Sequence, residues 1–229
     1  MMKVKLSSRL AAVASFVPLE STVADIGTDH GYLPIHLVTS GICSQVIASD
    51  TGKKPLLATE QLIKLLALDK KIDLRLGDGL RVLQPGEAET VCIAGMGGAT
   101  IIKILEEAPA QLSTVKRLIL QPMKVPPQVR EWLMNHDWRV VGEEIIFEDK
   151  LFYEIIAAEP GREILSEEEL EVGPVLLKTK HPMLKAFLTK KVETLEYILK
   201  SLEKSSTETD KQKKIMNKAI RLKRVIKCL

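Results

Sequence analysis

Apolar and polar residues along the chain alternate between strand-sized and helix-sized segments. Short apolar runs suited to buried strands occur at residues 23–26, 45–50, 72–76, 90–94 and 117–123. Segments with helical spacing of apolar residues lie at 7–17, 33–40, 54–68, 99–107 and 127–135. This alternation predicts an α/β fold in which helices link parallel strands.

The pattern changes after residue 135. Residues 139–147 and 152–158 have the character of an antiparallel pair closed around residues 148–150, which brings the expected sheet to seven strands. Pro160 and Gly161 then mark a boundary. The sequence therefore predicts a Rossmann-like seven-stranded domain over residues 1–160 and a small helical domain over residues 161–229.

The second domain has apolar residues spaced by alternating steps of three and four. They form two sets, Leu188, Val192, Leu195, Leu199 and Leu202, then Ile215, Ala219, Leu222, Ile226 and Leu229. A polar stretch at 205–210 separates the sets, so an antiparallel coiled-coil hairpin is expected. Basic residues lie off this seam and should be exposed: Lys185, Lys190, Lys200, Lys218, Arg221, Lys223 and Arg224.

Charge is distributed unequally between the two predicted domains. Residues 1–160 hold 17 lysines and arginines against 20 acids, and residues 161–229 hold 16 against 10. A basic tail on an acidic body favours a polyanionic partner, although a solvated lysine-rich helix has the same composition. The three cysteines are far apart, which indicates reduced thiols and no metal site. Without a leader or a membrane-length apolar run, we expect a cytoplasmic protein that does not bind membranes.

The first strand leads into a glycine-containing turn, Gly27-Thr28-Asp29-His30-Gly31. Turns at this place in α/β sheets bind nucleotides. The aspartate in this turn, Asp29, would repel a pyrophosphate but attract the sulfonium and ammonium groups of S-adenosylmethionine. We therefore assign Asp25, Gly27 and Gly31 to a methyl-donor site, with a plain turn as the alternative.

Acids and glycines after the next two strands extend this candidate site. Asp50, followed by Thr51, is placed to hold ribose hydroxyls, although Asp50 could equally cap a helix. Asp78 and Gly79 could accept a hydrogen bond from the adenine amino group of the donor, or simply form a turn.

Two further segments are candidates for donor contact. Gly95, Met96 and Gly97 follow the fourth strand, where glycines allow backbone to approach a ligand closely. Arg9, in the first helix, could close over the donor carboxylate or form a surface salt bridge.

Four motifs together resemble a known family. Residues 25–34 read Asp-Ile-Gly-Thr-Asp-His-Gly-Tyr-Leu-Pro, 77–80 Gly-Asp-Gly-Leu, 93–98 Ile-Ala-Gly-Met-Gly-Gly and 118–122 Leu-Ile-Leu-Gln-Pro. In this order and spacing they are similar to the bacterial tRNA (adenine-22)-N1-methyltransferases, over nearly the whole chain. The resemblance implies methylation of adenine N1 in tRNA with S-adenosylmethionine, by an enzyme expected to be a monomer, whose helical tail helps to hold the RNA.

The resemblance also places residues around the acceptor base. Asp29, His30 and Tyr32 would surround it, together with the loop at residues 95–98 and with Gln121 and Pro122. In the tail, Lys218, Arg221 and Arg224 would contact tRNA.

Chemical roles can be weighed for the three acceptor residues. Asp29 could accept from the adenine amino group and face the positive charge that develops on the ring. His30 could orient Asp29, take up the amino proton, or be structural. Tyr32 could stack on an extruded base or pack in the core. Methylation of another RNA or a small molecule, or RNA binding without catalysis, remain alternatives.

Overall fold

The computed structural model describes residues 4–202 and 210–229, apart from the side chain of residue 211. The chain divides into two compact units, residues 1–165 and 166–229. The predicted polar connector at 205–210 lies outside the described residues except for Asp210, which begins a helix.

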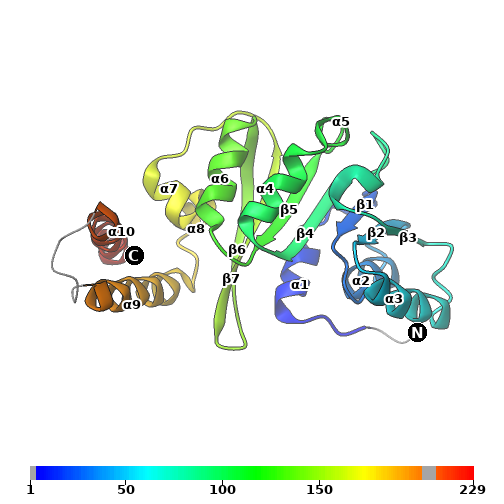
Figure 1. Ribbon diagram of the computed structural model, residues 1–229, viewed down its shortest axis with the longest axis horizontal. Coiled ribbons are helices and arrows are strands. Elements are labelled where there is room, and N and C mark those ends of the chain that lie inside the picture. Colours follow the sequence, from blue (N-terminus) through cyan, green and yellow to red (C-terminus); the bar gives the residue numbers. More distant parts are fainter. Residues whose placement is uncertain (1–3, 203–209) are drawn as a thin grey trace. The chain divides into compact units, whose positions relative to one another are not determined.

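The first unit contains one seven-stranded sheet with the strand order β3-β2-β1-β4-β5-β7-β6 (Figure 1). The five parallel strands are β1 (Val23–Ile26), β2 (Val46–Asp50), β3 (Ile72–Leu76), β4 (Thr90–Met96) and β5 (Arg117–Pro122). All five match the predicted strands closely. β1 lies between β2 and β4, so the strand order reverses beside β1.

The sheet is completed by a long antiparallel hairpin. It consists of β6 (Trp138–Glu148) and β7 (Leu151–Pro160), and β7 pairs with β5 in antiparallel orientation. β6 therefore runs parallel to β5, and the turn of the hairpin lies on the side where the parallel strands end. The predicted pair is confirmed and is longer at both ends than its sequence pattern indicated.

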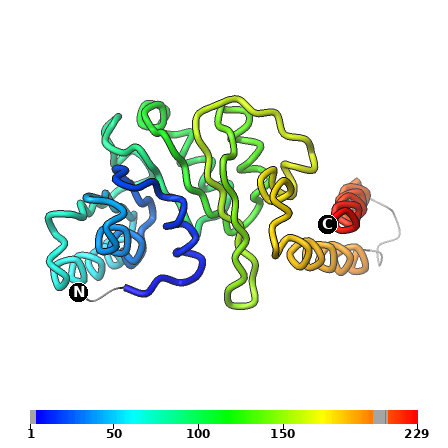
Figure 2. The backbone as a smooth tube through the Cα atoms, turned by 180° about the vertical axis from the view of Figure 1, so that it is seen from behind, coloured from blue at the N-terminus to red at the C-terminus, as the bar shows by residue number. Residues whose placement is uncertain are grey.

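Helices cover both faces of the sheet (Figure 2). One face carries α1 (Ser8–Ser15), α2 (Tyr32–Thr39) and α3 (Lys53–Leu65), and the other carries η1 (Gly79–Val82), α4 (Gly98–Glu106) and α6 (Pro126–Asn135). The short helix α5 (Pro109–Leu112) was not predicted. Ser7 caps α1 through its side chain, as its position suggested, and Pro34 lies in the first turn of α2.

A buried ion cluster joins α6 to the hairpin. Arg130 is fully buried, and its guanidinium donates to Glu143 of β6 at 2.7 Å and to Glu154 of β7 at 2.8 Å. Removing one partner from such a group leaves an uncompensated charge, which costs about 3–5 kcal/mol. The cluster therefore holds the base of the hairpin in one position against α6.

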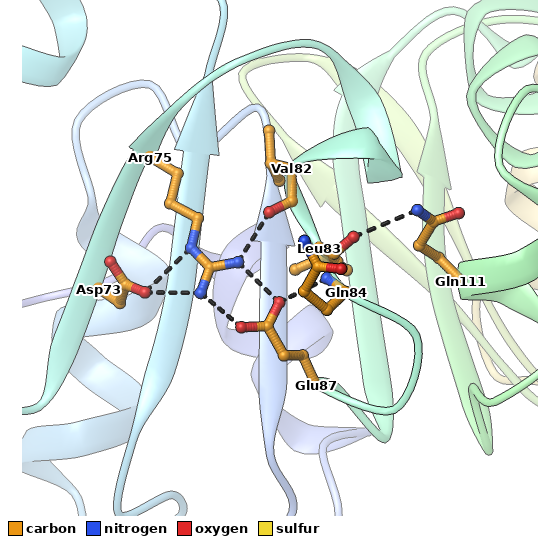
Figure 3. Close-up of polar contacts among 7 residues, drawn as sticks. All are labelled: Asp73, Arg75, Val82, Leu83, Gln84, Glu87 and Gln111. Atoms are coloured by element: carbon orange, nitrogen blue, oxygen red, sulfur yellow. Dashed lines mark hydrogen bonds and ion pairs between the residues drawn. The ribbon is translucent and has the colours of Figure 1, made fainter.

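A second polar network ties β3 to the loop after η1 (Figure 3). The Arg75 guanidinium donates to Asp73, to both carboxylate oxygens of Glu87 and to the Val82 carbonyl. Hydrogen bonding from Arg75 lowers the pKa of Glu87 to about 2. The network fixes the long β3–β4 connection, which carries part of the candidate site.

The second unit contains four helices within its described residues. They are α7 (Glu167–Val172), α8 (Pro174–Thr179), α9 (Leu184–Leu202) and α10 (Asp210–Cys228). α9 and α10 pack against each other, and every residue of the predicted seam is buried or half-buried. That this packing is a coiled coil stays a prediction. α7 and α8 were not predicted, because each is too short to show a period.

Candidate functional site

A cavity of about 180 Å³ opens at the carboxyl ends of the parallel strands. Residues from the ends of β1, β2, β3 and β4 meet there, beside the point where the strand order reverses. Open α/β sheets bind ligands at such a point. The lining residues are Ile26, Gly27, Asp50, Thr51, Gly77, Asp78, Gly79, Met96, Thr100 and Ile104.

Glycines bring backbone to the surface of this cavity. Gly27 and Gly79 have φ values of 78° and 57°, in the left-handed region that favours glycine. A Cβ atom at Gly27 would lie 2.1 Å from the Met96 Cε atom. The Met96 side chain therefore packs directly on the Gly27 backbone and narrows the cavity at that point.

Asp50 organises the loops on one side of the cavity. Its carboxylate accepts hydrogen bonds from Gly52 N–H at 2.7 Å and Asp29 N–H at 3.2 Å. Gly52 is the N-cap residue of α3, and no side chain caps this helix, so the Asp50 carboxylate holds the loop before α3 and does not cap the helix. The carboxylate also lines the cavity, where its predicted contact with ribose hydroxyls stays a prediction.

Asp25 lies in β1, behind the cavity, and is nearly fully buried. Burial raises the pKa of its carboxyl group to about 6, and the nearby Asp50 carboxylate adds to the rise. It does not line the cavity. Any contribution to ligand binding would act through charge at the start of the loop that contains Gly27.

The chemistry of the lining fits a nucleoside that carries positive charge. Asp50 and Asp78 supply two carboxylates, and the described lining residues include no lysine or arginine. Such a surface would repel a pyrophosphate and attract a sulfonium or ammonium group. The residues present are therefore compatible with S-adenosylmethionine.

Asp29, His30 and Tyr32 form an exposed group next to this cavity. The Asp29 carboxylate lies 3.5 Å from His30 Nε2, and the Asp29 side chain is 69% exposed. The His30 and Tyr32 rings are 5.6 Å apart. Tyr32 is 44% exposed, so it does not pack in the core. All three side chains are open to a large substrate.

The backbone beneath this group is held in an uncommon conformation. Asp29 has a φ of 51°, and its carbonyl accepts a hydrogen bond from Thr59 Oγ1 at 3.0 Å. Gly31 has a φ of 69°, and a Cβ atom there would lie 2.4 Å from Thr59 Cγ2. Contacts with α3 thus support the turn that presents Asp29.

Arg9 contacts Gln121, near the end of β5, which in turn contacts Gly95, near the end of β4. The Arg9 Nη1 atom donates to Gln121 Oε1 at 2.6 Å, and the same oxygen accepts from Gly95 N–H at 3.1 Å. The guanidinium also lies 5.6 Å from the Tyr153 ring centroid. Arg9 does not line the donor cavity and bonds to Gln121, and its predicted donor contact stays a prediction.

The predicted acceptor residues Gln121 and Pro122 are both buried. Gln121 bonds to Arg9 and to Gly95 near the end of β4, and its predicted contact with the acceptor stays a prediction. Gly95 has a φ of 80°, and Gly97 caps α4. Neither Gly95 nor Gly97 lines the donor cavity.

Four residues that line the cavity were not assigned to it from the sequence, and one of them, Ile26, is the last residue of β1. Gly77 belongs to the recognised Gly-Asp-Gly motif and could have been included on that signal. Thr100 and Ile104 lie one turn apart on α4. Their spacing is ordinary for any helix, so only the packing of α4 against η1 identifies them.

The predicted RNA-binding cations of the second unit differ in exposure. Lys218 and Arg221 are half-buried, contrary to expectation, because each pairs with a carboxylate of α7. Their partners are Glu171 and Glu167 respectively. Arg224 is exposed and has no ion pair within the described residues.

Two kinds of feature are absent from the described residues. None of their helices is long and apolar enough to cross a membrane. In the same part of the chain, no group of three or more histidine, cysteine or acidic residues is arranged to hold a metal ion.

Comparison with known proteins gives a consistent result. Residues 23–225 match the family described as tRNA (adenine(22)-N(1))-methyltransferase. The tRNA (adenine(22)-N(1))-methyltransferase of Bacillus subtilis is 36% identical over 220 residues, which cover 93% of this chain and 92% of that protein.

Solved structures agree over the full length. A Streptococcus pneumoniae protein in complex with S-adenosyl-L-methionine is 34% identical with a TM-score of 0.89, covering 97% of this chain and 100% of that one. The Mycoplasma capricolum enzyme TrmK, in complex with S-adenosyl-homocysteine, is 27% identical with a TM-score of 0.86, covering 97% and 98%. The chain therefore belongs to the tRNA (adenine(22)-N(1))-methyltransferase family.

Proposed function

We propose that this protein transfers a methyl group from S-adenosylmethionine to N1 of adenine 22 in tRNA. The observation that carries the proposal is the family match over residues 23–225, combined with the acidic, glycine-lined cavity at the carboxyl ends of β1 to β4. No feature of the described residues favours a small molecule over RNA as the acceptor.

The donor would be held in that cavity. Asp50 would hold the ribose hydroxyls and Asp78 the adenine amino group, and both line the cavity, while Gly27 and Gly79 would allow the backbone to approach closely. When bound, S-adenosylmethionine supplies an electrophilic methyl group, and adenine N1 has a free lone pair to receive it. Positioning of the two reactants therefore provides much of the catalysis.

Asp29 is the proposed electrostatic catalyst. The adenine ring becomes cationic as the new bond forms, so a fixed carboxylate nearby stabilises the transition state more than the ground state. The Asp29 side chain is exposed and next to the donor cavity, where an incoming base would cover it. His30, at 3.5 Å, would orient the carboxylate, and Tyr32 would stack on the base.

The domain assignment is part of the proposal. Residues 1–160 would bind the donor and carry out the reaction, and residues 161–229 would bind tRNA. The basic balance of the second segment supports this division, with Arg224 as its exposed candidate contact. Lys218 and Arg221 could contribute only by exchanging their carboxylate partners for phosphates. We also propose that the protein acts as a monomer in the cytoplasm.

Transfer of labelled methyl from S-adenosylmethionine to unmodified bulk tRNA, followed by nucleoside analysis, tests the function. We expect 1-methyladenosine only in tRNAs with adenine at position 22, and the same tRNAs with guanine at that position should stay unlabelled. Donor binding without any labelling of tRNA would move the assignment to another acceptor. Analytical ultracentrifugation of the active protein tests whether it is a monomer.

A further inference from the structure

The β6–β7 hairpin extends beyond the rest of the sheet at the edge where the donor cavity opens (Figures 1 and 2). Leu120 of β5 faces Ile156 of β7, so the register carries Pro122 to the level of Glu154. Phe152 precedes Glu154 by two residues. At about 3.3 Å per residue, it therefore lies about 7 Å beyond the end of β5. We call residues 147–152 the hairpin tip.

The hairpin tip carries a pair of aromatic side chains. Phe147 and Phe152 face each other across the two strands, with ring centroids 4.7 Å apart. Phe147 is 51% exposed although it is large and apolar, and Leu151 beside it is also exposed. Aromatic residues make up only 4% of the chain, so an exposed pair at this edge is an unusual use of them.

The hairpin is anchored at its tip and at its base. At the tip, the Ser8 N–H group donates to Glu148 Oε1 at 2.6 Å. Despite partial burial, which opposes the effect, this bond and others from the start of α1 lower the pKa of Glu148. At the base, Arg130 holds Glu143 and Glu154. These contacts fix the tip relative to the sheet.

A separate set of contacts connects the hairpin to the end of β4, beside the donor cavity. Alternate residues of β7 point to opposite faces, so Tyr153 lies on the face opposite Phe152. Tyr153 contacts Arg9, and Arg9 reaches Gly95 through Gln121. The aromatic pair therefore has a defined position relative to the place where the acceptor would react.

The acceptor chemistry identifies the partner. N1 lies on the pairing edge of adenine, so a paired adenine must leave its helix before it can be methylated. Extrusion leaves neighbouring bases without a stacking partner, and apolar side chains inserted between base steps fill such gaps. Aromatic rings stack on any base.

We propose that the hairpin tip inserts into the substrate RNA beside the target adenine and that Phe147 stacks on a base exposed by its extrusion. This inference rests on the proposed function. It adds a substrate contact in the first unit, distinct from the basic residues of the second. Phe152 supports Phe147 from the neighbouring strand.

The test compares Phe147→Ala with wild type in single-turnover methyl transfer to two RNAs. One is the folded tRNA, and the other carries a change opposite the target adenine that abolishes its pairing. We expect Phe147→Ala to slow methylation of the folded tRNA by about ten- to a hundredfold. The loss should shrink to within about threefold on the unpaired RNA, because extrusion then needs less help.

Two control variants accompany the test. Phe147→Tyr keeps the aromatic ring and should restore nearly the wild-type rate. Leu65→Ala truncates an exposed apolar side chain at the end of α3, at the opposite edge of the sheet, and should leave both rates unchanged. Donor affinity, measured by calorimetry, should be the same in all the variants.

Several outcomes would overturn the proposal. Equal rates for Phe147→Ala and wild type on both RNAs would show that the tip does not contact substrate. Equal losses on both RNAs, or a loss of donor affinity, would indicate a structural role. A change in sedimentation with unchanged methylation would assign the surface to a second copy of the chain. Wild-type protein that labels neither RNA would refute the proposed function instead.

Discussion

The two compact units create their candidate surfaces in different ways. In the first unit, the donor cavity combines Gly27, Asp50, Asp78 and Met96, which come from the ends of four strands far apart in sequence. In the second, the exposed cations follow from the period of a single helix. The donor cavity therefore depends on the topology of the sheet, whereas the row of exposed cations depends only on the spacing of residues along one helix.

The second unit also shows that basic composition is not the same as free basic surface. Lys218, Arg221 and Lys223 pair with Glu171, Glu167 and Glu196. By contrast, one face of α10 at spacings of four and three consists of exposed residues only: Lys213, Asn217, Ile220, Arg224 and Lys227. This face is the better candidate for RNA phosphates, because its cations form no ion pair within the described residues.

Substitutions in the first unit should lower kcat, whereas substitutions in the second should lower the affinity for tRNA. The largest effect should come from Asp29→Asn, which removes the charge and keeps a residue type that tolerates the left-handed φ of 51°. We expect kcat for tRNA methylation to fall by about a hundredfold. Donor and tRNA affinities, measured by calorimetry and filter binding, should stay within a few-fold of wild type.

The asparagine variant is preferable to Asp29→Ala, since alanine would add backbone strain at this position. Asp29→Gly, which removes the side chain without that strain, is the matched control and should lose activity to the same extent. If donor affinity fell together with kcat in both variants, Asp29 would belong to the donor site and the assigned role would be wrong.

An intermediate effect is expected when Arg224 and Lys227 are both changed to glutamate. If each contacts a phosphate, the salt dependence of tRNA binding should become shallower by about 0.7 to 0.9 per contact on a logarithmic scale. Affinity at moderate salt should fall about tenfold, while kcat at saturating tRNA stays unchanged. Binding measured across a salt series checks this.

Lys70→Glu with Lys71→Glu makes the same charge change on exposed residues at the far edge of the first unit and serves as the control. An equal loss of binding in this control would mean that only net charge matters. Reversal of Lys218 is less informative, because it would place a carboxylate against Glu171 and destabilise the unit.

The smallest effect concerns Asp25 and the donor alone. Its pKa of about 6 lies above the ordinary value, so the carboxyl group of the free protein gains its charge as the pH rises from 5 to 7. A cationic donor favours the charged form, and donor affinity should therefore rise over this window by at most tenfold per pH unit. Asp25→Asn should abolish the pH dependence in calorimetry, and a flat wild-type profile would exclude a role for the Asp25 charge in donor binding.

The raised pKa of Asp25 also affects the free energy of unfolding, which should fall as the pH rises, whereas donor affinity should increase. The folded state binds the Asp25 proton more tightly than the unfolded state, so this residue favours folding below pH 4 and loses that contribution as the pH rises to about 6. Glu87, whose pKa is lowered, contributes above its ordinary pKa instead.

Local sequence determined most of the secondary structure. The strand Ile72–Leu76 was predicted with its observed bounds, and β4 was identified by an apolar run that only a doubly covered strand tolerates. The spacing of Leu188, Val192, Ala219 and Leu222 correctly predicted buried faces on α9 and α10. Periodicity and turn chemistry act within a few residues, so they can be read without knowledge of the fold.

Only the tertiary structure determined which groups the long side chains contact. Arg9 could equally have reached a donor, a carboxylate or Gln121, and only the packing of α1 against the sheet chose Gln121. Arg130, in an amphipathic helix, became fully buried because two strands supplied carboxylates. Lys218 was expected to be exposed, but it is half-buried and pairs with Glu171. Contacts between residues distant in sequence determine which side chains are buried, which charges are paired and which segments extend beyond the sheet. No local sequence pattern contains that information.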